Sequence, residues 1–330
     1  ISIRLVLIFN FFSIKDNNST VSRESRFKKI LLSSSFNFFF FKKFDINIFN
    51  LSVFFLLFMT VKFYNTILNN FKKKDIFYKY YKTSKSYNEF YQFINNIVYF
   101  LLKKNKKKRG VVVTYSNKSA EMYASVFPIL ISDFVWIPVS PEMPATRVEQ
   151  ILNLTKPDFF FYDTRNNDVF NKIKKKKIKM INFNFFHKNN FERINLLSVI
   201  KKLDFNKTAT IFFSSGSTGV PKGVKITHKN FITDVYLQKK HLYKNKTKSL
   251  IVGDYNDPSF STFFDIYFPV VLFGSTICPA ISRSDKFLMY DHYIKNKINT
   301  AVLVPSALER IKEILIRDKI KLTGKFLFMC

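Results

Sequence analysis

Cysteine and histidine are scarce in this chain, and their scarcity argues against two kinds of site. The 330 residues include two cysteines, Cys278 and Cys330, and four histidines. Two cysteines far apart in sequence cannot build a disulfide framework, and they fit a reducing, cytoplasmic setting. Because the histidines show no paired spacing with carboxylates or cysteines, we predict no metal site built from protein ligands.

Acidic residues are also few, which leaves a strong positive charge. The chain has 54 lysines and arginines against 23 aspartates and glutamates, a net charge of +31. Such a charge is typical of proteins that bind nucleic acid or an acidic membrane surface. Lysine, asparagine, isoleucine and phenylalanine are, however, enriched together along the whole chain, without zinc-finger spacing, an arginine-rich helix or internal repeats. We therefore attribute the charge to composition and expect no nucleic-acid partner.

The N-terminal part has no apolar run long enough for an ordinary membrane helix. Residues 46–61 are apolar apart from asparagines and small hydroxyls, but a bilayer requires roughly 20 such residues. An A-x-A-like cleavage site is missing too, which weakens a signal-peptide interpretation. A membrane anchor, a divergent domain edge and residues outside the native product remain as interpretations. We favour Met59, the first methionine, as the true start, so that residues 1–58 lie outside the domain formed by 59–330.

Short apolar strands alternate with helices from residue 78 onward. We expect strands near 110–115, 133–139, 159–163, 209–213, 224–226, 249–253, 276–279, 300–306 and 326–329. Expected helices include 86–101 with an N-cap at Ser86, 118–131, and 260–273, which ends at Gly274. This alternation predicts an α/β fold with mostly parallel sheets flanked by helices.

One loop carries most of the functional information. After the apolar strand 209–213 come Ser214, Ser215, Gly216, Ser217, Thr218, Gly219, Val220, Pro221, Lys222 and Gly223. Glycines let a backbone approach an anion and turn its N–H groups inward, hydroxyls add donors, and lysine adds a mobile charge. A solvated surface loop would not account for the Pro-Lys-Gly that follows the hydroxyls. We predict a phosphate-binding loop without the spacing of a Walker loop.

The same residues resemble the signature loop of the adenylate-forming superfamily, which comprises acyl-CoA synthetases, luciferases and amino-acid-adenylating domains of peptide synthetases. The helix at 86–101, the stretch 136–147 and the Thr-His-x-Asn at 227–230 are similar to further family elements. Ser140 departs from the pattern, because the peptide-synthetase branch usually has aspartate there. The resemblance covers about residues 78–330 and implies the N-terminal part of the large domain of such a ligase.

The resemblance also implies an activity and roles for residues. A carboxylic acid would react with ATP to give an acyl-adenylate and pyrophosphate, and the acyl group would pass to the thiol of CoA or of a phosphopantetheine carrier protein. Lys222 would be the catalytic cation, and the nucleotide would contact Ser214, Ser215, Gly216, Ser217, Thr218, Gly219, Lys222 and Gly223. Mg²⁺ would accompany ATP. For His228, a local structural role is about as well supported as a ligand contact.

Substrate choice is expected from residues 257–274. In the amino-acid-adenylating branch, an aspartate there binds the α-amine of the substrate. One alignment register places Phe260 at that position and leaves Asp265 as a structural carboxylate, whereas the other makes Asp265 the amine ligand. We favour the first register because it needs no gap. It predicts a neutral or acyl substrate, since a buried carboxylate without an amine partner is costly.

Later elements of the family, including its magnesium-binding glutamate and C-terminal lysine, are not found in these residues. We therefore expect a truncated ligase that does not catalyse alone. Two alternatives remain: a non-catalytic remnant of such a ligase, and a basic membrane-associated protein anchored by residues 46–61.

Overall fold

The computed structural model describes residues 48–104, 109–174, 176, 178–214, 220–241, 250–281, 289–303, 305–317 and 327–329. The chain divides into two compact units, Ile1–Phe58 and Met59–Cys330. Helix α4 (Ile48–Asn70) crosses the boundary between them. None of the helices in the described ranges is both long and apolar enough to span a bilayer. All other described elements belong to the second unit.

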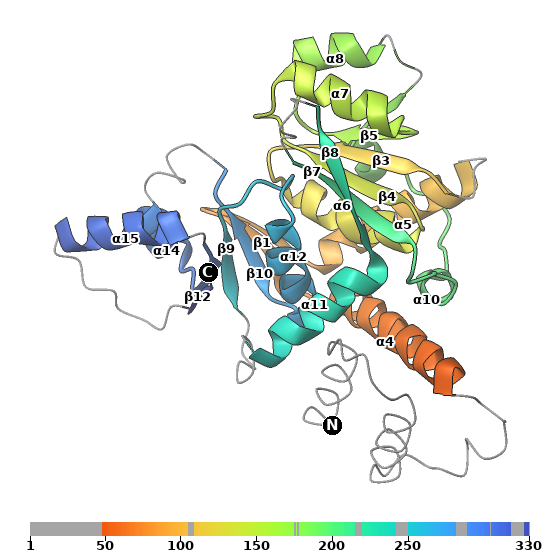
Figure 1. Cartoon of the computed structure of the whole chain (residues 1–330), viewed down its shortest axis with the longest axis horizontal. Coiled ribbons are helices and arrows are strands. Elements are labelled where there is room, and N and C mark those ends of the chain that lie inside the picture. Colours follow the sequence, from red (N-terminus) through yellow and green to blue (C-terminus); the bar gives the residue numbers. More distant parts are fainter. Residues whose placement is uncertain are drawn as a thin grey trace, which may run out of the picture. The chain divides into compact units, whose positions relative to one another are not determined.

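The described strands form two sheets, which we call the β9 sheet and the β3 sheet (Figure 1). The β9 sheet has the order β12 (Leu327–Met329), β11 (Thr300–Val302), β9 (Ile251–Asp254), β10 (Thr276–Pro279), β1 (Ile76–Tyr80) and β2 (Thr83–Ser86). The β3 sheet has the order β6 (Lys179–Asn182), β5 (Phe159–Tyr162), β3 (Val111–Tyr115), β4 (Val135–Val139), β7 (Thr208–Ser214) and β8 (Lys222–Thr227). In each sheet, neighbouring strands pair in parallel except at one edge. There β2 is antiparallel to β1 in the β9 sheet, and β8 is antiparallel to β7 in the β3 sheet. The predicted α/β class is confirmed.

Helices connect many of the parallel strands. They are α5 (Tyr91–Tyr99), α6 (Ala120–Ile131), α7 (Ala145–Thr155), α8 (Asn167–Lys174), α9 (Asn184–Lys188), α10 (Leu196–Ile200), α11 (His228–His241), α12 (Thr262–Phe273), α14 (Met289–Asn296) and α15 (Pro305–Arg317). The predicted N-cap at Ser86 is wrong. Ser86 ends β2, its N–H and hydroxyl both donate to Glu89, and the helical segment opens with a 3₁₀ turn, η1 (Asn88–Phe90). A π-helical turn, η2 (Phe100–Lys104), follows α5.

Side chains alternate between the two faces of the β3 sheet. Val113, Ile137 and Phe160 pack with residues of α7 and α8 in one core. Their neighbours along the strands, such as Val112 and Trp136, pack into a second core with residues of α5, α6 and α12. A strand with both faces buried must be apolar at nearly every position, which explains the continuous apolar runs in the sequence.

Aromatic rings fill the core that α4, α11 and α12 share with the β3 sheet. The ring of Trp136 stacks on Phe264 at a centroid distance of 5.7 Å, and Phe231 stacks on Phe268 at 4.4 Å. Phe63 of α4 packs against Phe268 at 5.5 Å. Rings of this size bury large apolar areas, so these contacts contribute strongly to the stability of the unit.

The second half of α4 belongs to this core, although the sequence pattern became recognisable only from residue 78. Phe63, Tyr64 and Ile67 are fully buried. The side-chain amide of Asn70 donates to the carbonyl oxygens of Val271 and Leu272 at 2.8 and 3.1 Å, at the end of α12. Helix α4 thus satisfies carbonyl groups that the last turn of α12 leaves free.

Gly274 ends α12, as predicted. Its φ of 64° lies in the left-handed region, where a side chain would be strained. A Cβ atom there would also lie 3.4 Å from the amide of Asn70. The positive φ, rather than lack of space beside Asn70, therefore accounts for glycine at this position.

His228 lies inside this core and pairs with α4. Its Nδ1 is 2.6 Å from the hydroxyl of Tyr64, and both side chains are fully buried. Burial, with a contribution from the charges of Arg109 and Lys207, lowers the pKa of His228 to about 3. Among the described residues, its Nε2 has no hydrogen-bond partner. The imidazole is therefore neutral, and its hydrogen bond to Tyr64 ties the start of α11 to α4.

We expect the domain to fold without residues 1–58, because core packing in the second unit begins at Met59. A chain of residues 59–330 should keep the thermal unfolding midpoint of the whole chain, measured by circular dichroism. Removing residues 1–71 instead should lower the midpoint by several degrees or abolish the transition, since this also deletes buried aromatic side chains. If residues 59–330 alone lose cooperative unfolding, residues 1–58 belong to the domain.

The buried His228 predicts a pH dependence of stability. The folded state holds the imidazole neutral down to about pH 3, whereas the unfolded chain binds a proton near pH 6.5. The contribution of the neutral imidazole to the free energy of unfolding is thus fully present above pH 6.5. It is lost as the pH falls towards 3, by about 1.4 kcal/mol per pH unit at most. Denaturant titrations should show that the free energy of unfolding falls less between pH 7 and pH 5 in His228→Gln than in the wild type. The matched His187→Gln variant, at an exposed position, should retain the wild-type difference; equal differences in both variants would contradict the assignment.

Candidate functional site

The predicted phosphate loop joins two antiparallel strands. Ser214 at the end of β7 pairs in register with Lys222 at the start of β8, and Phe213 pairs with Gly223. The chain therefore returns as a hairpin, whereas a Walker loop leads directly into a helix. Five of the predicted residues lie outside the described residues: Ser215, Gly216, Ser217, Thr218 and Gly219.

Two cationic side chains lie at the described ends of this loop. Lys222 is exposed, and no carboxylate within the described ranges forms an ion pair with it. Arg147, in the first turn of α7, donates from Nη2 to the carbonyl oxygen of Ser214 at 2.5 Å. Arg147 lies in the stretch 136–147, which resembles a family element, and no role was predicted for it. Its bond to Ser214 links that stretch to the predicted phosphate loop.

Gly223 has a packing reason to be glycine. A Cβ atom at this position would lie 2.9 Å from Cγ2 of Ile211 and 3.1 Å from a ring carbon of Phe213. Side chains of β7 therefore occupy the space beside β8. This packing explains the residue without any contact to an anion.

Parallel pairing places the end of β4 at the same edge of the sheet as the hairpin loop. Thr210 of β7 donates from Oγ1 to the carbonyl oxygen of Trp136 at 2.8 Å, and the same two residues are paired in register. Beyond β4, the hydroxyl of Ser140 accepts the N–H of Glu142 at 3.2 Å. Ser140 thus forms the turn between strand and helix that the sequence analysis favoured for it.

A buried ion pair joins the ends of strands from the two sheets. The ammonium of Lys118, which follows β3, lies 3.8 Å from Oδ1 of Asp254 and donates to its carbonyl oxygen at 3.1 Å. The Tyr123 hydroxyl donates to Oδ2 of the same carboxylate. Burial, together with the charge of Asp254, raises the pKa of Tyr123 well above its ordinary value. Sequence reasoning missed this cluster, although a polar residue at or directly after each buried strand was a signal.

The two candidate substrate residues have different surroundings. Phe260 is 61% exposed, in the turn that precedes α12. Asp265 lies in the first turn of α12, and its carboxylate accepts the side-chain N–H of Gln238 in α11 at 2.7 Å. Burial and the nearby Asp234 raise the pKa of Asp265 to about 6, against the effect of the Gln238 hydrogen bond. In this structure, Asp265 connects two helices.

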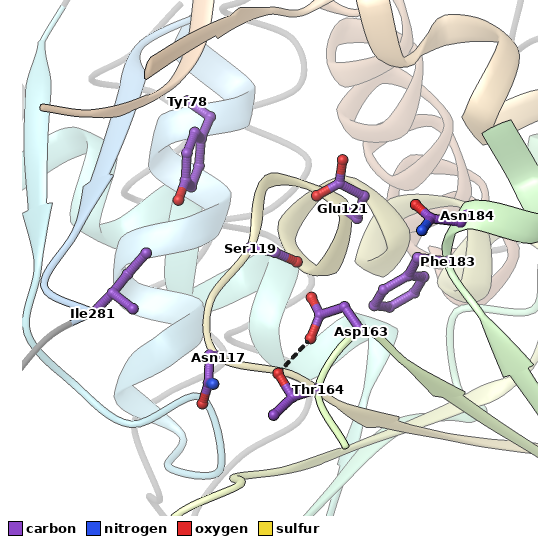
Figure 2. Close-up of a pocket in the computed structure, with 9 residues that line it drawn as sticks. All are labelled: Tyr78, Asn117, Ser119, Glu121, Asp163, Thr164, Phe183, Asn184 and Ile281. Carbon is purple, nitrogen blue, oxygen red and sulfur yellow. Dashed lines mark hydrogen bonds between the residues drawn. The ribbon is translucent and has the colours of Figure 1, made fainter. Parts of the chain in front are cut away.

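A cavity of about 390 Å³ lies at the carboxyl ends of several parallel strands (Figure 2). Its walls include residues within two positions of the ends of β3, β5, β6 and β10. Ligands of open α/β sheets bind at this edge. The sequence analysis did not predict the cavity, which is lined by Tyr78, Asn117, Ser119, Glu121, Asp163, Thr164, Phe183, Asn184 and Ile281.

Comparisons with known proteins agree with this fold. Apicidin F synthase of Gibberella fujikuroi is 27% identical over 193 residues, which are 58% of this chain and 4% of that protein. The N-terminal subdomain of Klebsiella oxytoca NpsA, in complex with 3-hydroxybenzoyl-AMSN, superposes with a TM-score of 0.64 at 16% identity, over 78% of this chain and 62% of that one. Holo-AB3403, a four-domain nonribosomal peptide synthetase bound to AMP and glycine, superposes with a TM-score of 0.63 at 16% identity. The superposition covers 81% of this chain and 19% of that one.

The family assignment comes from a match over most of the chain. The model of the AMP-binding enzymes covers residues 67–325, and it begins within α4, upstream of the limit at residue 78 that the motifs indicated. The predicted resemblance to adenylate-forming enzymes is confirmed by this match and by the relatives. The chain spans about 4% of the length of that curated relative. It belongs to the family of AMP-binding enzymes.

Proposed function

We propose that this chain serves the ATP-dependent activation of a carboxylic acid to an acyl-adenylate. The observation that carries the proposal is the β7–β8 hairpin, which sets Ser214 opposite Lys222 around a loop of glycines and hydroxyls. The relationship to apicidin F synthase and the fold shared with a synthetase bound to AMP and glycine support it.

The proposed reaction is a displacement at the α-phosphorus of ATP. A carboxylate oxygen of the acid forms a bond to this phosphorus, and the bond to the bridging oxygen of pyrophosphate breaks. Negative charge is spread over the phosphate oxygens as pyrophosphate leaves, so fixed donors and a cation lower the barrier. Lys222 supplies the cation, and Ser214 with Ser215, Gly216, Ser217, Thr218, Gly219 and Gly223 supplies the loop that holds the phosphates. Arg147 holds the start of this loop by its bond to Ser214.

The remaining parts of the proposal concern Mg²⁺ and the acyl acceptor. No three imidazole, thiol or carboxylate groups gather as a metal site within the described part of the chain, so we assign Mg²⁺ no protein ligand and derive no step through it. The acceptor is the thiol of CoA or of a phosphopantetheine carrier protein. A cytoplasmic setting is supported by the buried Cys278, which is a free thiol.

For the acid, we propose a substrate without an α-amine. Asp265 lies between α11 and α12, where it accepts a hydrogen bond from Gln238 and has Asp234 as a neighbour. Phe260 is exposed at the turn that precedes α12. In an active protein that contains this segment, ATP–pyrophosphate exchange should be no faster with an α-amino acid than with the matching acid that lacks the amine. A clear preference for the amino acid would contradict this proposal and assign the binding of the α-amine to Asp265 or Asp257.

Lys222→Ala should weaken the binding of pyrophosphate to the full chain by about tenfold, because a hydrogen bond to a charged group is lost. Isothermal titration calorimetry at physiological ionic strength, where the Debye length is about 8 Å, measures this affinity. The matched control is Lys225→Ala, which removes an equal charge from an exposed position of the same strand.

Lys225→Ala should change the affinity by less than about twofold, since exposed charges are strongly screened. If both variants weaken binding equally, pyrophosphate responds only to the general positive charge of the chain. Unchanged binding by Lys222→Ala would remove Lys222 from the phosphate site.

A further inference from the structure

The cavity at the ends of β3, β5, β6 and β10 is acidic, although the chain is strongly basic. Its described lining residues include the carboxylates of Glu121 and Asp163 and, among those residues, no lysine or arginine. The whole chain has 54 basic residues against 23 acidic ones. A cavity that concentrates carboxylates against this background attracts cations that the rest of the surface repels.

Tyr78 contributes a polar group to this cavity from a side chain that is otherwise buried. The residue is 5% exposed, and its hydroxyl points into the space that the lining residues surround (Figure 2). Within the described residues, no group forms a hydrogen bond with this hydroxyl. Burial raises the pKa of Tyr78, and the charges of Glu121 and Asp163 contribute, so the phenol remains neutral. A hydroxyl that opens onto a cavity and has no protein partner is free to bond water or a ligand.

The carboxylate of Asp163 is held in a fixed orientation. Its Oδ2 accepts the hydroxyl of Ser116 at 2.6 Å, and its Oδ1 accepts that of Thr164 at 2.9 Å. An ionised carboxylate has about four lone-pair sites, so both oxygens can accept further donors from a ligand. Glu121 faces the cavity from the first turn of α6, with Oε1 3.3 Å from Nε2 of His187.

These groups suit an organic cation better than a metal ion. No three metal-ligating side chains come together among the residues described, and two of the neighbouring groups are aromatic, Tyr78 and Phe183. Carboxylates accept the N–H groups of an ammonium, and aromatic rings attract its charge and adjoining carbon atoms. The volume of about 390 Å³ lies within the range of small-molecule sites.

We propose that this cavity binds a small organic ammonium ion, with its N–H groups donating to Asp163 and Glu121. Its alkyl part lies against Tyr78 and Phe183. The site is separate from the phosphate loop, because β4 lies between β3 and β7 in the strand order of the sheet. The inference thus stands whether or not the loop binds ATP.

The test uses n-butylammonium chloride as the probe and the full chain. Saturation-transfer NMR and calorimetry, with sodium chloride matching the ionic strength, should show saturable binding of butylammonium. Neutral 1-butanol, which has the same alkyl chain, should bind at least tenfold more weakly. Equal binding of the two would overturn the proposal, as would displacement of butylammonium by equimolar magnesium chloride, which would indicate an inorganic cation site.

Isosteric variants locate the site. Asp163→Asn should weaken butylammonium binding by about tenfold, and Glu121→Gln by about threefold. The control Asp168→Asn removes the same charge from an exposed position in the first turn of α8 and should leave the affinity unchanged. Since Asp163→Asn also alters the bonds to Ser116 and Thr164, Glu121→Gln provides an independent measurement. Wild-type affinity in Glu121→Gln, or equal loss in Asp168→Asn, would contradict the proposal.

Discussion

Burial of both faces of the β3 sheet is the constraint on which the other features depend. Side chains of β3, β4 and β5 alternate between two cores, so each face needs its own covering helices. The helices that provide this cover also connect parallel strands, which places the loops that follow the strands at one edge. The hairpin that carries the predicted phosphate loop and the acidic cavity both lie at this edge. Their position follows from the packing of the sheet before any chemistry is considered.

The two sheets are held together by contacts of very different kinds. Aromatic rings from α4, α11 and α12 fill the space against Trp136, and they stabilise the structure mainly by burying apolar area, which is a non-directional effect. The pair of Lys118 and Asp254 is buried and directional. Loss of one partner would leave an unpaired buried charge, at a cost of about 3–5 kcal/mol. The pair therefore fixes how the ends of β3 and β9 lie relative to each other.

Much of the fold could be predicted from local pattern. Strands such as β3 and β4 are continuous apolar runs, the turn at Ser140 follows a strand end, and Gly274 marks the end of α12. The hairpin β1–β2 was missed, because β2 is a short polar edge strand without an apolar pattern. Residues 46–61 resemble a membrane segment in composition, and the packing of Phe63, in the second half of α4, against α11 and α12 could not be read from the sequence. The cavity and the pair of Lys118 with Asp254 join residues distant in sequence, which no local pattern reveals.

The order of strands along the chain has a consequence for how the protein folds during synthesis. The β3 sheet is built from one continuous stretch, whereas β1 must pair with β10, with Tyr78 opposite Ile277. At roughly 5–20 residues per second, the ribosome needs on the order of 10–40 s to make the intervening chain. Throughout this interval β1 lacks its partner β10, and Phe63 of α4 lacks its partner Phe268 for nearly all of it. Strands β3 to β8, which form the β3 sheet, all lie between residues 111 and 227, so their synthesis is complete before that of β10.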